Sequence, residues 1–335
     1  MKKGINLILI ILFLAGLLFS AGCSSTARNT TQPEKVYHVG ILCGLTFFAD
    51  TETGFRQKMT ELGYVEGKNI VYESYKMDYD PVAFKKILDK FRDEKVDLVF
   101  TFPTSSALLA KEELNGTGIP IVFANSFTDD MGLIDSVRQP GDNITGVRWG
   151  GPDIALERYT IMHELSPQTR RMFVMYQSGT AVVKSQIEAL DRQAPADGIT
   201  LVEIPADNAT DLTKKLQDQT VNSSGDAILM IAEPLLVTPD GFTVAAKFAG
   251  NHHIPLGGAY MAAGGYESLY GVTPQSVPQG REAAVLADKI LRGEPAGTIP
   301  VVTADNYFQL SYRAAQNQGL NVSPDLLNRA DQIIR

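Results

Sequence analysis

The chain has 335 residues, of which 44% are hydrophobic and 20% charged, and its formal net charge is −8. This length and composition are those of a globular protein with room for about two domains. The charge is acidic and no basic run follows Lys2 and Lys3. The composition therefore gives no support to nucleic-acid binding, and the folded part is poorly suited to an anionic membrane surface.

The first 22 residues have the charge and hydropathy order of a secretory signal. Two lysines precede an apolar stretch over 5–19, which is shorter than the ~20 residues of a permanent membrane span. Small residues at 20–22 then lead to Cys23, as in a bacterial lipobox, although Ser20 stands where such motifs usually carry Leu. We expect a lipoprotein signal peptide over 1–22, lipid on Cys23 and a polar tether over 23–35. A plain cleaved signal is the alternative.

The second cysteine, Cys43, lies in an apolar run and is expected to be a small buried hydrophobe. The sequence leaves a disulfide between Cys23 and Cys43 as an alternative.

Strand-like and helix-like segments alternate beyond the tether. The first half predicts strands over 37–43, 70–75, 96–100, 119–124 and 144–149, and helices over 53–62, over 82–92 and after residues 104–106. The second half predicts strands over 171–176, 199–204, 226–231 and 253–256, and helices over 154–165, 180–193, 209–220 and 241–249. Such alternation indicates parallel βαβ units. We predict an α/β fold with two lobes, 36–147 and 148–274, each a parallel sheet flanked by helices.

The elements become shorter after Gly265. A helix is expected over 277–292, with short strands over 268–272, 299–302 and 307–310, while 320–335 carries no strong signal. A helix that follows a completed second lobe is expected to pack back on the first. We therefore assign 275–302 to the first lobe and 303–335 to the second.

The sequence lacks the usual signatures of catalysis. It contains no G-x-S-x-G, no G-x-x-x-x-G-K-[ST] and no H-E-x-x-H motif. His252 and His253 are adjacent, so in the expected strand they would point to opposite faces, which disfavours a shared metal. An extracellular enzyme would have to use Asp129 or Glu233 without a triad or a cofactor loop. We expect no enzyme, no metal and no cofactor.

Polar and aromatic residues recur after the predicted strands, where open α/β sheets bind their ligands. In the first lobe these candidates are Thr46, Phe47, Phe48, Thr104, Ser105, Ser106, Ser126, Thr128 and Asp129. In the second lobe they are Gln177, Ser178, Thr180, Glu233 and Tyr260. Two facing lobes would place both sets around one cleft. The aromatic members could stack on a planar ligand or simply line the cleft.

Several of these segments resemble a known family of bacterial proteins. The resemblance is carried by GILCGLTFFADTETGFRQKMTELGYVEGKNIVYE, VDLVFTFPTSSALLAKE, IPIVFANSFTDDMGL, QPGDNITGV and VPQGREAAVLADKILRGEPAGTIPV. These segments are similar to the substrate-binding proteins of an ABC-importer family often described as aromatic amino acid-binding. The resemblance covers most of 36–320, and GYVEGKN and PGDNITGV are its most specific parts.

The resemblance implies a type I periplasmic-binding fold, in which three chain crossings form a hinge between two lobes, and it implies no catalysis. Residues 104–106 and 126–129 match first-lobe loops whose hydroxyls and N–H groups would hold a ligand carboxylate. The second lobe departs from the family, because Glu233 and its neighbours replace a Thr-Asp-Asn run, and Ala259 and Tyr260 replace a Ser-Asp pair. Glu233 could meet a ligand amine, or a salt bridge to Arg or Lys could pin its loop.

These observations predict a solute-binding lipoprotein of the cell envelope, held to a membrane through the lipid on Cys23 and facing the periplasm or the exterior. Its expected partners are a small-molecule ligand and the ABC permease of the inner membrane. The ligand would be an amino acid or another small planar or amine-bearing molecule. The alternative is a sensor of the same fold that acts with a membrane receptor.

Overall fold

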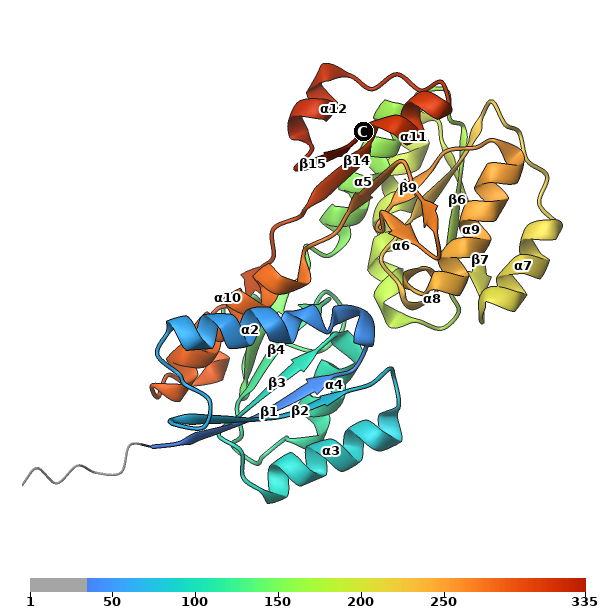
Figure 1. The fold of residues 1–335 in the computed structure, drawn as a ribbon. Helices are drawn as coiled ribbons and strands as arrows, with labels where there is room; N and C mark the ends of the chain where they lie inside the picture. Colours follow the sequence, from blue (N-terminus) through green and yellow to red (C-terminus); the bar gives the residue numbers. More distant parts are fainter. Residues whose placement is uncertain (1–34) are drawn as a thin grey trace, which may run out of the picture. The chain divides into compact units, whose positions relative to one another are not determined.

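The computed structural model describes residues 35–335 (Figure 1). The expected signal peptide, Cys23 and all but the last residue of the tether lie outside the described residues. Within 35–335, no helix has the length and apolar character needed to cross a membrane.

The first lobe is built on a parallel sheet with strand order β13-β5-β4-β3-β1-β2. Its strands are β1 (Tyr37–Cys43), β2 (Ile70–Lys76), β3 (Leu98–Phe102), β4 (Ile121–Ser126), β5 (Ile144–Arg148) and β13 (Val302–Thr303). Every residue of β3 and β4 is buried. Burial on both faces explains why these strands read as continuous apolar runs rather than as alternating patterns.

Helices cover both faces of this sheet. They are α2 (Asp50–Glu61), α3 (Pro81–Asp93), α4 (Thr104–Glu113) and α10 (Ser276–Leu291), with the short 3₁₀ helices η1 (Thr46–Phe48) and η3 (Ala296–Thr298). Helices α2 and α10 share one core with the sheet, and α3 and α4 share the other. Helix α3 illustrates how the sequence places a helix on the sheet. It buries one apolar stripe, formed by Phe84, Ile87, Leu88 and Phe91, and the side chain of Asp80 caps its first turn.

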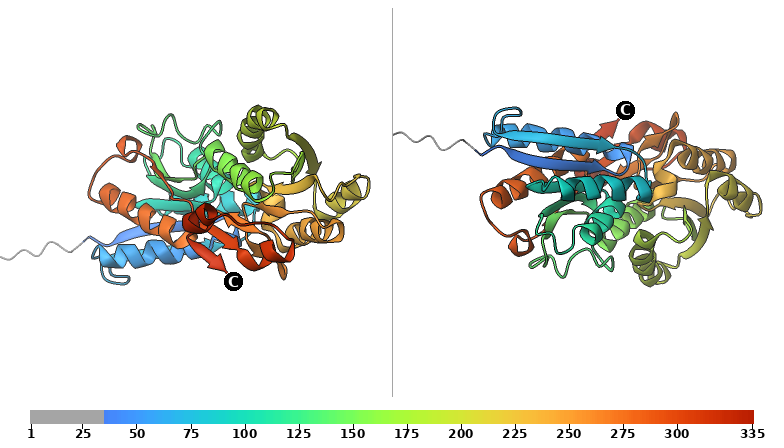
Figure 2. Two further views of the ribbon diagram at one scale, coloured as in Figure 1. Left: turned by 90° about the horizontal axis from the view of Figure 1, so that it is seen from above. Right: turned by 90° about the horizontal axis from the view of Figure 1, so that it is seen from below.

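The late helix α10 lies directly against α2, as Figure 2 shows. Glycine allows this contact from both sides. A Cβ on Gly54 would lie 2.0 Å from the carbonyl oxygen of Val277, and a Cβ on Gly280 would lie 1.9 Å from that of Thr51. The two helix backbones therefore approach more closely than any side chain would permit.

The second lobe is built on a sheet with strand order β15-β14-β12-β9-β8-β6-β7, in which only the β12–β14 pair is antiparallel. Its strands are β6 (Arg171–Gln177), β7 (Thr200–Ala206), β8 (Asp226–Met230), β9 (Leu256–Gly258), β12 (Tyr270–Val272), β14 (Phe308–Ser311) and β15 (Gln332–Ile334). A small hairpin joins β10 (Ala262–Ala263) to β11 (Tyr266–Glu267).

The helices of the second lobe are α5 (Pro152–Leu165), α6 (Ala181–Gln193), η2 (Ala194–Asp197), α7 (Ala209–Gln217), α8 (Pro234–Val237), α9 (Pro239–His252), α11 (Tyr312–Asn317) and α12 (Pro324–Arg329). Helices α5 and α6 pack on one face of the sheet, and α7 and α9 pack on the other. The predicted α/β fold with two sheets flanked by helices is confirmed.

One local expectation was wrong. The strand predicted over 253–256 does not begin until Leu256, because α9 continues to His252 and His253 ends it in the left-handed conformation at φ 53°. The adjacent histidines therefore belong to a helix end and not to a strand. The signal-poor segment 320–335 is also structured, since it forms α12 and β15, and β15 extends the second sheet beside β14.

Candidate functional site

A cavity of about 650 Å³ opens where the strand ends of the two lobes meet; we call it the interlobe cleft. Its walls come from the ends of the strands and the segments that follow them: β1 to β5 in the first lobe, and β6, β8 and β9 in the second. Ligands of open α/β sheets bind outside the carboxyl ends of the strands. The cavity therefore lies where this architecture places a ligand.

Half of the predicted site residues line the interlobe cleft. They are Phe48, Thr104, Ser105, Gln177, Thr180, Glu233 and Tyr260. The structure thus brings together candidates from both lobes, separated by up to 212 residues in sequence from Phe48 to Tyr260.

Several first-lobe candidates point elsewhere. The exposed Thr46 hydroxyl donates to Oδ1 of Asp78 at 2.7 Å. The hydroxyls of Ser106 and Ser126 are bonded locally, to the carbonyl oxygens of Pro103 and Ala124. Phe47 is 53% exposed and lies outside the cleft lining, although its ring contacts that of Tyr260 edge-on at 5.9 Å.

The remaining candidates also lie outside the lining. The Asp129 carboxylate pairs with Arg148 at 3.3 Å, and Thr128 accepts a hydrogen bond from the same guanidinium. Ser178 is exposed, and its backbone N–H donates to the carbonyl of Ala206. In this structure the bonds described for Thr128, Asp129 and Ser178 lie within and between the strand-end loops.

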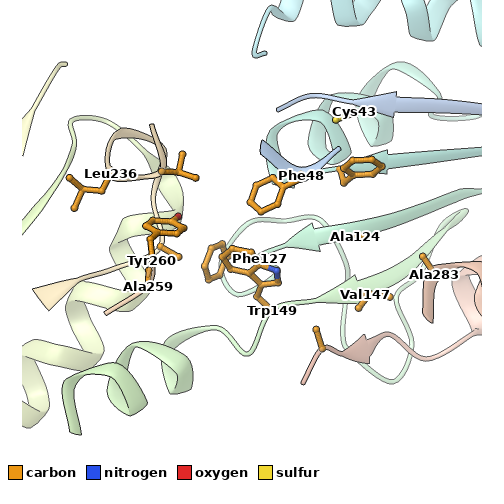
Figure 3. Close-up of a cluster of buried hydrophobic side chains, with 14 of the residues drawn as sticks. Cys43, Phe48, Ala124, Phe127, Val147, Trp149, Leu236, Ala259, Tyr260 and Ala283 are labelled. Carbon is orange, nitrogen blue, oxygen red and sulfur yellow. The ribbon is translucent and has the colours of Figure 1, made fainter. Parts of the chain in front are cut away.

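Aromatic rings from both lobes face the interlobe cleft. Figure 3 shows Phe48, Phe127 and Trp149 on the side of the first sheet and Tyr260 across from them. The Trp149 ring meets Phe127 at 5.2 Å and Phe48 at 5.8 Å, both edge-on. In these contacts the edge of one ring packs against the face of its neighbour, which fixes the three rings in the wall of the cleft.

Among the lining residues that sequence reasoning did not select are Asn125 and Trp149, and Phe127, which lay within the matched loop 126–129 but was not chosen as a contact residue. A signal for Trp149 was present, because it ended the strand predicted over 144–149 and strand ends are where ligands bind. Asn125, near the end of β4, and Phe127, directly after it, stand beside the predicted candidates Ser126 and Thr128. Asn125 adopts a left-handed φ of 49°, which sequence alone does not reveal.

Glu233 caps helix α8 at the edge of the cleft. Its Oε2 accepts from the backbone N–H groups of Gln177 and Leu235, each at 2.8 Å, and its Oε1 accepts from that of Leu236. The side chain is buried, and burial raises the pKa of its carboxyl to about 7 although these three bonds act to lower it. Within 35–335 no Arg or Lys pairs with Glu233, so backbone donors hold this loop in place of the salt bridge considered from the sequence.

The cleft lining in the described chain contains no Lys, Arg or His, and its acids are Glu112 and Glu233. Two helices begin at its walls instead: α4 at Thr104 and α6 at Ala181. No side chain caps the first turn of either helix. The first N–H groups of such helices lack intrahelical acceptors and favour a ligand group that accepts hydrogen bonds.

A group of potential metal ligands lies away from the cleft. Ligand atoms of His38, Glu73 and Glu94 lie within 4.8 Å of one another at the outer part of the first sheet. The Lys90 ammonium pairs with both Glu73 and Glu94. A protein cation therefore already neutralises these carboxylates.

Two α/β lobes with one cleft at their strand ends define a bilobal solute-binding protein. Residues 48–334 match the family described as ABC transporter substrate binding protein, and the chain belongs to this family. Members of this family bind a substrate for an ABC transporter outside the cytoplasm and are not enzymes.

Relatives agree with this assignment. A tyrosine-binding protein of Clostridioides difficile (strain R20291) is 26% identical over 89% of this chain and 87% of its own length. The ABC domain from Streptococcus pneumonia in complex with L-Trp superposes with a TM-score of 0.75 at 19% identity, covering 88% of this chain and all of that one. A ligand-free, open substrate-binding protein with adhesive properties from Clostridium difficile gives a TM-score of 0.71 at 22% identity, over 90% of this chain and 99% of that one.

Proposed function

We propose that this protein captures an aromatic amino acid, or a molecule of closely similar chemistry, in the interlobe cleft and delivers it to an ABC permease. The observation that carries the proposal is the set of aromatic rings in the cleft: Phe48 and Phe127 of the first lobe, Trp149 directly after β5 at the boundary between the lobes, and Tyr260 of the second lobe. Offset and edge-on contacts to a ligand ring contribute ~0.5–1.5 kcal/mol each beyond area burial. The relatives that bind tyrosine and L-Trp point to the same class.

We infer that the lobes close on this ligand by bending at three crossings. The lobe boundaries in this proposal are 36–147 with 275–302, and 148–274 with 303–335. Sheet membership supports them, since β13 joins the first sheet whereas β14 and β15 join the second. Phe47 of the first lobe already meets Tyr260 edge-on, so closure would narrow the remaining cleft and would be stabilised by contacts that the ligand makes with both lobes.

The proposed partners are the small-molecule ligand, the permease of the inner membrane and a membrane that holds the lipid on Cys23. A polar tether over 23–35 would let the folded body stand away from the membrane. The proposal includes no nucleic acid and no cofactor.

The test is a binding titration followed through Trp149, the chain's single tryptophan. Because Trp149 lines the cleft, adding L-tyrosine should change its emission in a saturable manner with one ligand per chain. The substitution Trp149→Phe should remove the change in tryptophan emission. Calorimetry on this variant should still detect heat of binding. A panel of L-tyrosine, L-tryptophan and L-phenylalanine that gives no saturable change and no heat would contradict the proposal.

A further inference from the structure

The interlobe cleft continues along helix α4, beyond the strand ends. Its lining includes Thr104, Ser105, Leu108, Leu109 and Glu112. Residues four apart lie on one face of a helix, so these five positions form a single face. At a rise of 1.5 Å per residue, the helix axis advances by ~12 Å from Thr104 to Glu112. The cavity therefore follows this face of α4 for about two turns.

The middle of this face is apolar and incompletely covered. Leu108 and Leu109 are half-buried and pack against the same core of the first lobe as Met131, which also lines the cleft. The loop that carries Met131 is tied to the helix, because Nζ of Lys111 donates to the carbonyl oxygen of Gly132 at 3.1 Å. We call the part of the cleft lined by Leu108, Leu109 and Met131 the α4 groove. Apolar surface left open within a cavity is typical of a ligand-binding groove.

Other lining residues of the cleft add to this apolar surface. Tyr79, in the loop after β2, is 62% exposed. From the second lobe, Ala181 and Val182 begin α6, and Val237 ends α8. Within the described chain, the only acid on the α4 face of the cleft is Glu112, whose side chain is exposed to solvent. An uncharged apolar group could be buried along α4 without leaving a charge unpaired.

The size of the cavity exceeds the needs of a single amino acid. Its volume of about 650 Å³ lies within the range of ~300–1,000 Å³ for sites that hold drug-sized ligands. One residue of an extended chain spans at most ~3.3–3.6 Å, so ~12 Å of helix face matches the length of about three residues. An amino acid whose ring lies among Phe48, Trp149 and Tyr260 would leave much of the α4 groove uncovered.

We propose that the preferred ligand is a short aromatic peptide, in which the aromatic residue lies among the rings of the cleft and an apolar neighbouring residue lies in the α4 groove. The inference rests on the proposed function, because it takes an aromatic ligand in this cleft as given. A free aromatic amino acid then fills only the inner part of the cleft and binds more weakly than the peptide.

The experiment compares five probes by calorimetry. They are L-tyrosine and two pairs of dipeptides: glycyl-tyrosine with leucyl-tyrosine, and tyrosyl-glycine with tyrosyl-leucine. The members of each pair have the same charges and the same backbone, and they differ only in the isobutyl group. The two pairs extend tyrosine from its amine and from its carboxyl, so either direction of the chain is covered.

Two substitutions accompany the probes. Leu109→Gln keeps a residue of similar helix propensity but replaces the apolar surface of the α4 groove with an amide. Leu327→Gln is the matched control, because Leu327 is also a half-buried helical leucine that packs against a core, in α12 and outside the cleft. Melting curves verify that each variant is folded.

At least one leucyl peptide should bind wild type about 10-fold or more tightly than its glycyl counterpart, the factor expected from burying one leucine side chain. The same peptide should also bind more tightly than L-tyrosine. In Leu109→Gln the ratio of leucyl to glycyl affinity should fall about threefold or more, because part of the apolar contact is lost. Leu327→Gln should keep the wild-type ratio.

Other outcomes separate the two proposals. If wild type binds neither L-tyrosine nor any of the peptides, the aromatic-ligand function itself is contradicted and the inference falls with it. If wild type binds L-tyrosine, and both leucyl peptides bind no more tightly than L-tyrosine or than their glycyl counterparts, the inference alone is overturned. A folded Leu109→Gln that keeps the full ratio also overturns it. Should this variant fail to fold, the comparison of the peptides on wild type still decides.

Discussion

The indole Nε1 of Trp149 donates a hydrogen bond of 3.0 Å to Oε1 of Gln279, and the same oxygen accepts the backbone N–H of Asn125. The other end of the Gln279 amide donates to the carbonyl oxygens of Pro274 and Gln275. These two residues belong to the crossing between β12 and α10. One buried side chain therefore connects two residues of the cleft wall to a crossing between the lobes.

Replacing Gln279 with methionine tests this connection, because the length is kept and the polar atoms are lost. Gln279→Met leaves the N–H groups of Trp149 and Asn125 without their acceptor, and we expect the free energy of unfolding to fall by about 1–3 kcal/mol. Urea denaturation measures the loss. Gln316→Met, on the exposed face of α11, should stay within about 0.5 kcal/mol of wild type. Equal stability of both variants would show that the Gln279 bonds carry no net energy.

Glycine-to-alanine changes should lower stability at the contact between α2 and α10 and raise it at an exposed glycine elsewhere. Gly54→Ala or Gly280→Ala would push a methyl group into a backbone carbonyl, and we expect each to lose about 1–3 kcal/mol of stability or more. At Gly250, in α9, the added methyl would meet nothing within 4 Å. Gly250→Ala should therefore gain about 0.5–1 kcal/mol. The same direction of change at all three positions, measured by denaturation, would refute the packing argument.

Glu233 predicts a pH dependence of stability. Burial raises the pKa of its carboxyl to about 7 in the folded protein, above an unfolded value of about 4.3. The folded state therefore binds the extra proton between these values, and the contribution of Glu233 to the free energy of unfolding declines as pH rises through about 7. Glu233→Gln, which cannot ionise, should lose less stability than wild type between about pH 5 and about pH 8.

Denaturation of both proteins at the two pH values provides the check. Glu294→Gln, an exposed substitution in the loop after α10, serves as the control and should follow wild type. If Glu233→Gln and wild type lose the same stability across this range, the carboxyl does not titrate there.

The lipid anchor is predicted for Cys23 from the sequence alone. A diacylated protein should enter the detergent phase on phase separation, because two chains anchor stably where one holds only marginally. Cys23→Ala should move to the aqueous phase. If wild type and Cys23→Ala partition equally between the two phases, Cys23 carries no lipid.

The fold was readable because its strands and helices are long and regularly patterned. The buried strand β3 shows a continuous apolar run, and α3 shows one stripe with Asp80 and Pro81 at its start. The end of α9 was misjudged because a left-handed histidine, rather than a glycine, ends the helix. Segment 320–335 gave no pattern because β15 has only three residues and depends on β14 for its bonds.

The site was predicted less completely, for a different physical reason. Residues directly after a predicted strand, such as Thr104 and Gln177, were found from their position alone. Asn125 could not be found in this way, because its contacts come from residues far away in sequence. Thr51, 74 residues away, bonds its side-chain Oδ1, and Gln279, 154 residues away, accepts its backbone N–H. Glu233 was recognised as unusual, but its backbone partners depend on the helix α8 that it caps.

Small-angle scattering of the protein with and without L-tyrosine tests the central claim that two lobes close on one ligand. At a ligand concentration of about 100 times the dissociation constant, the ligand should stabilise the fold by ~2.7 kcal/mol. Under those conditions the radius of gyration should fall, because contacts from both lobes hold the cleft shut. If saturating L-tyrosine raises the melting temperature but leaves the radius of gyration unchanged, the lobes do not close on the ligand.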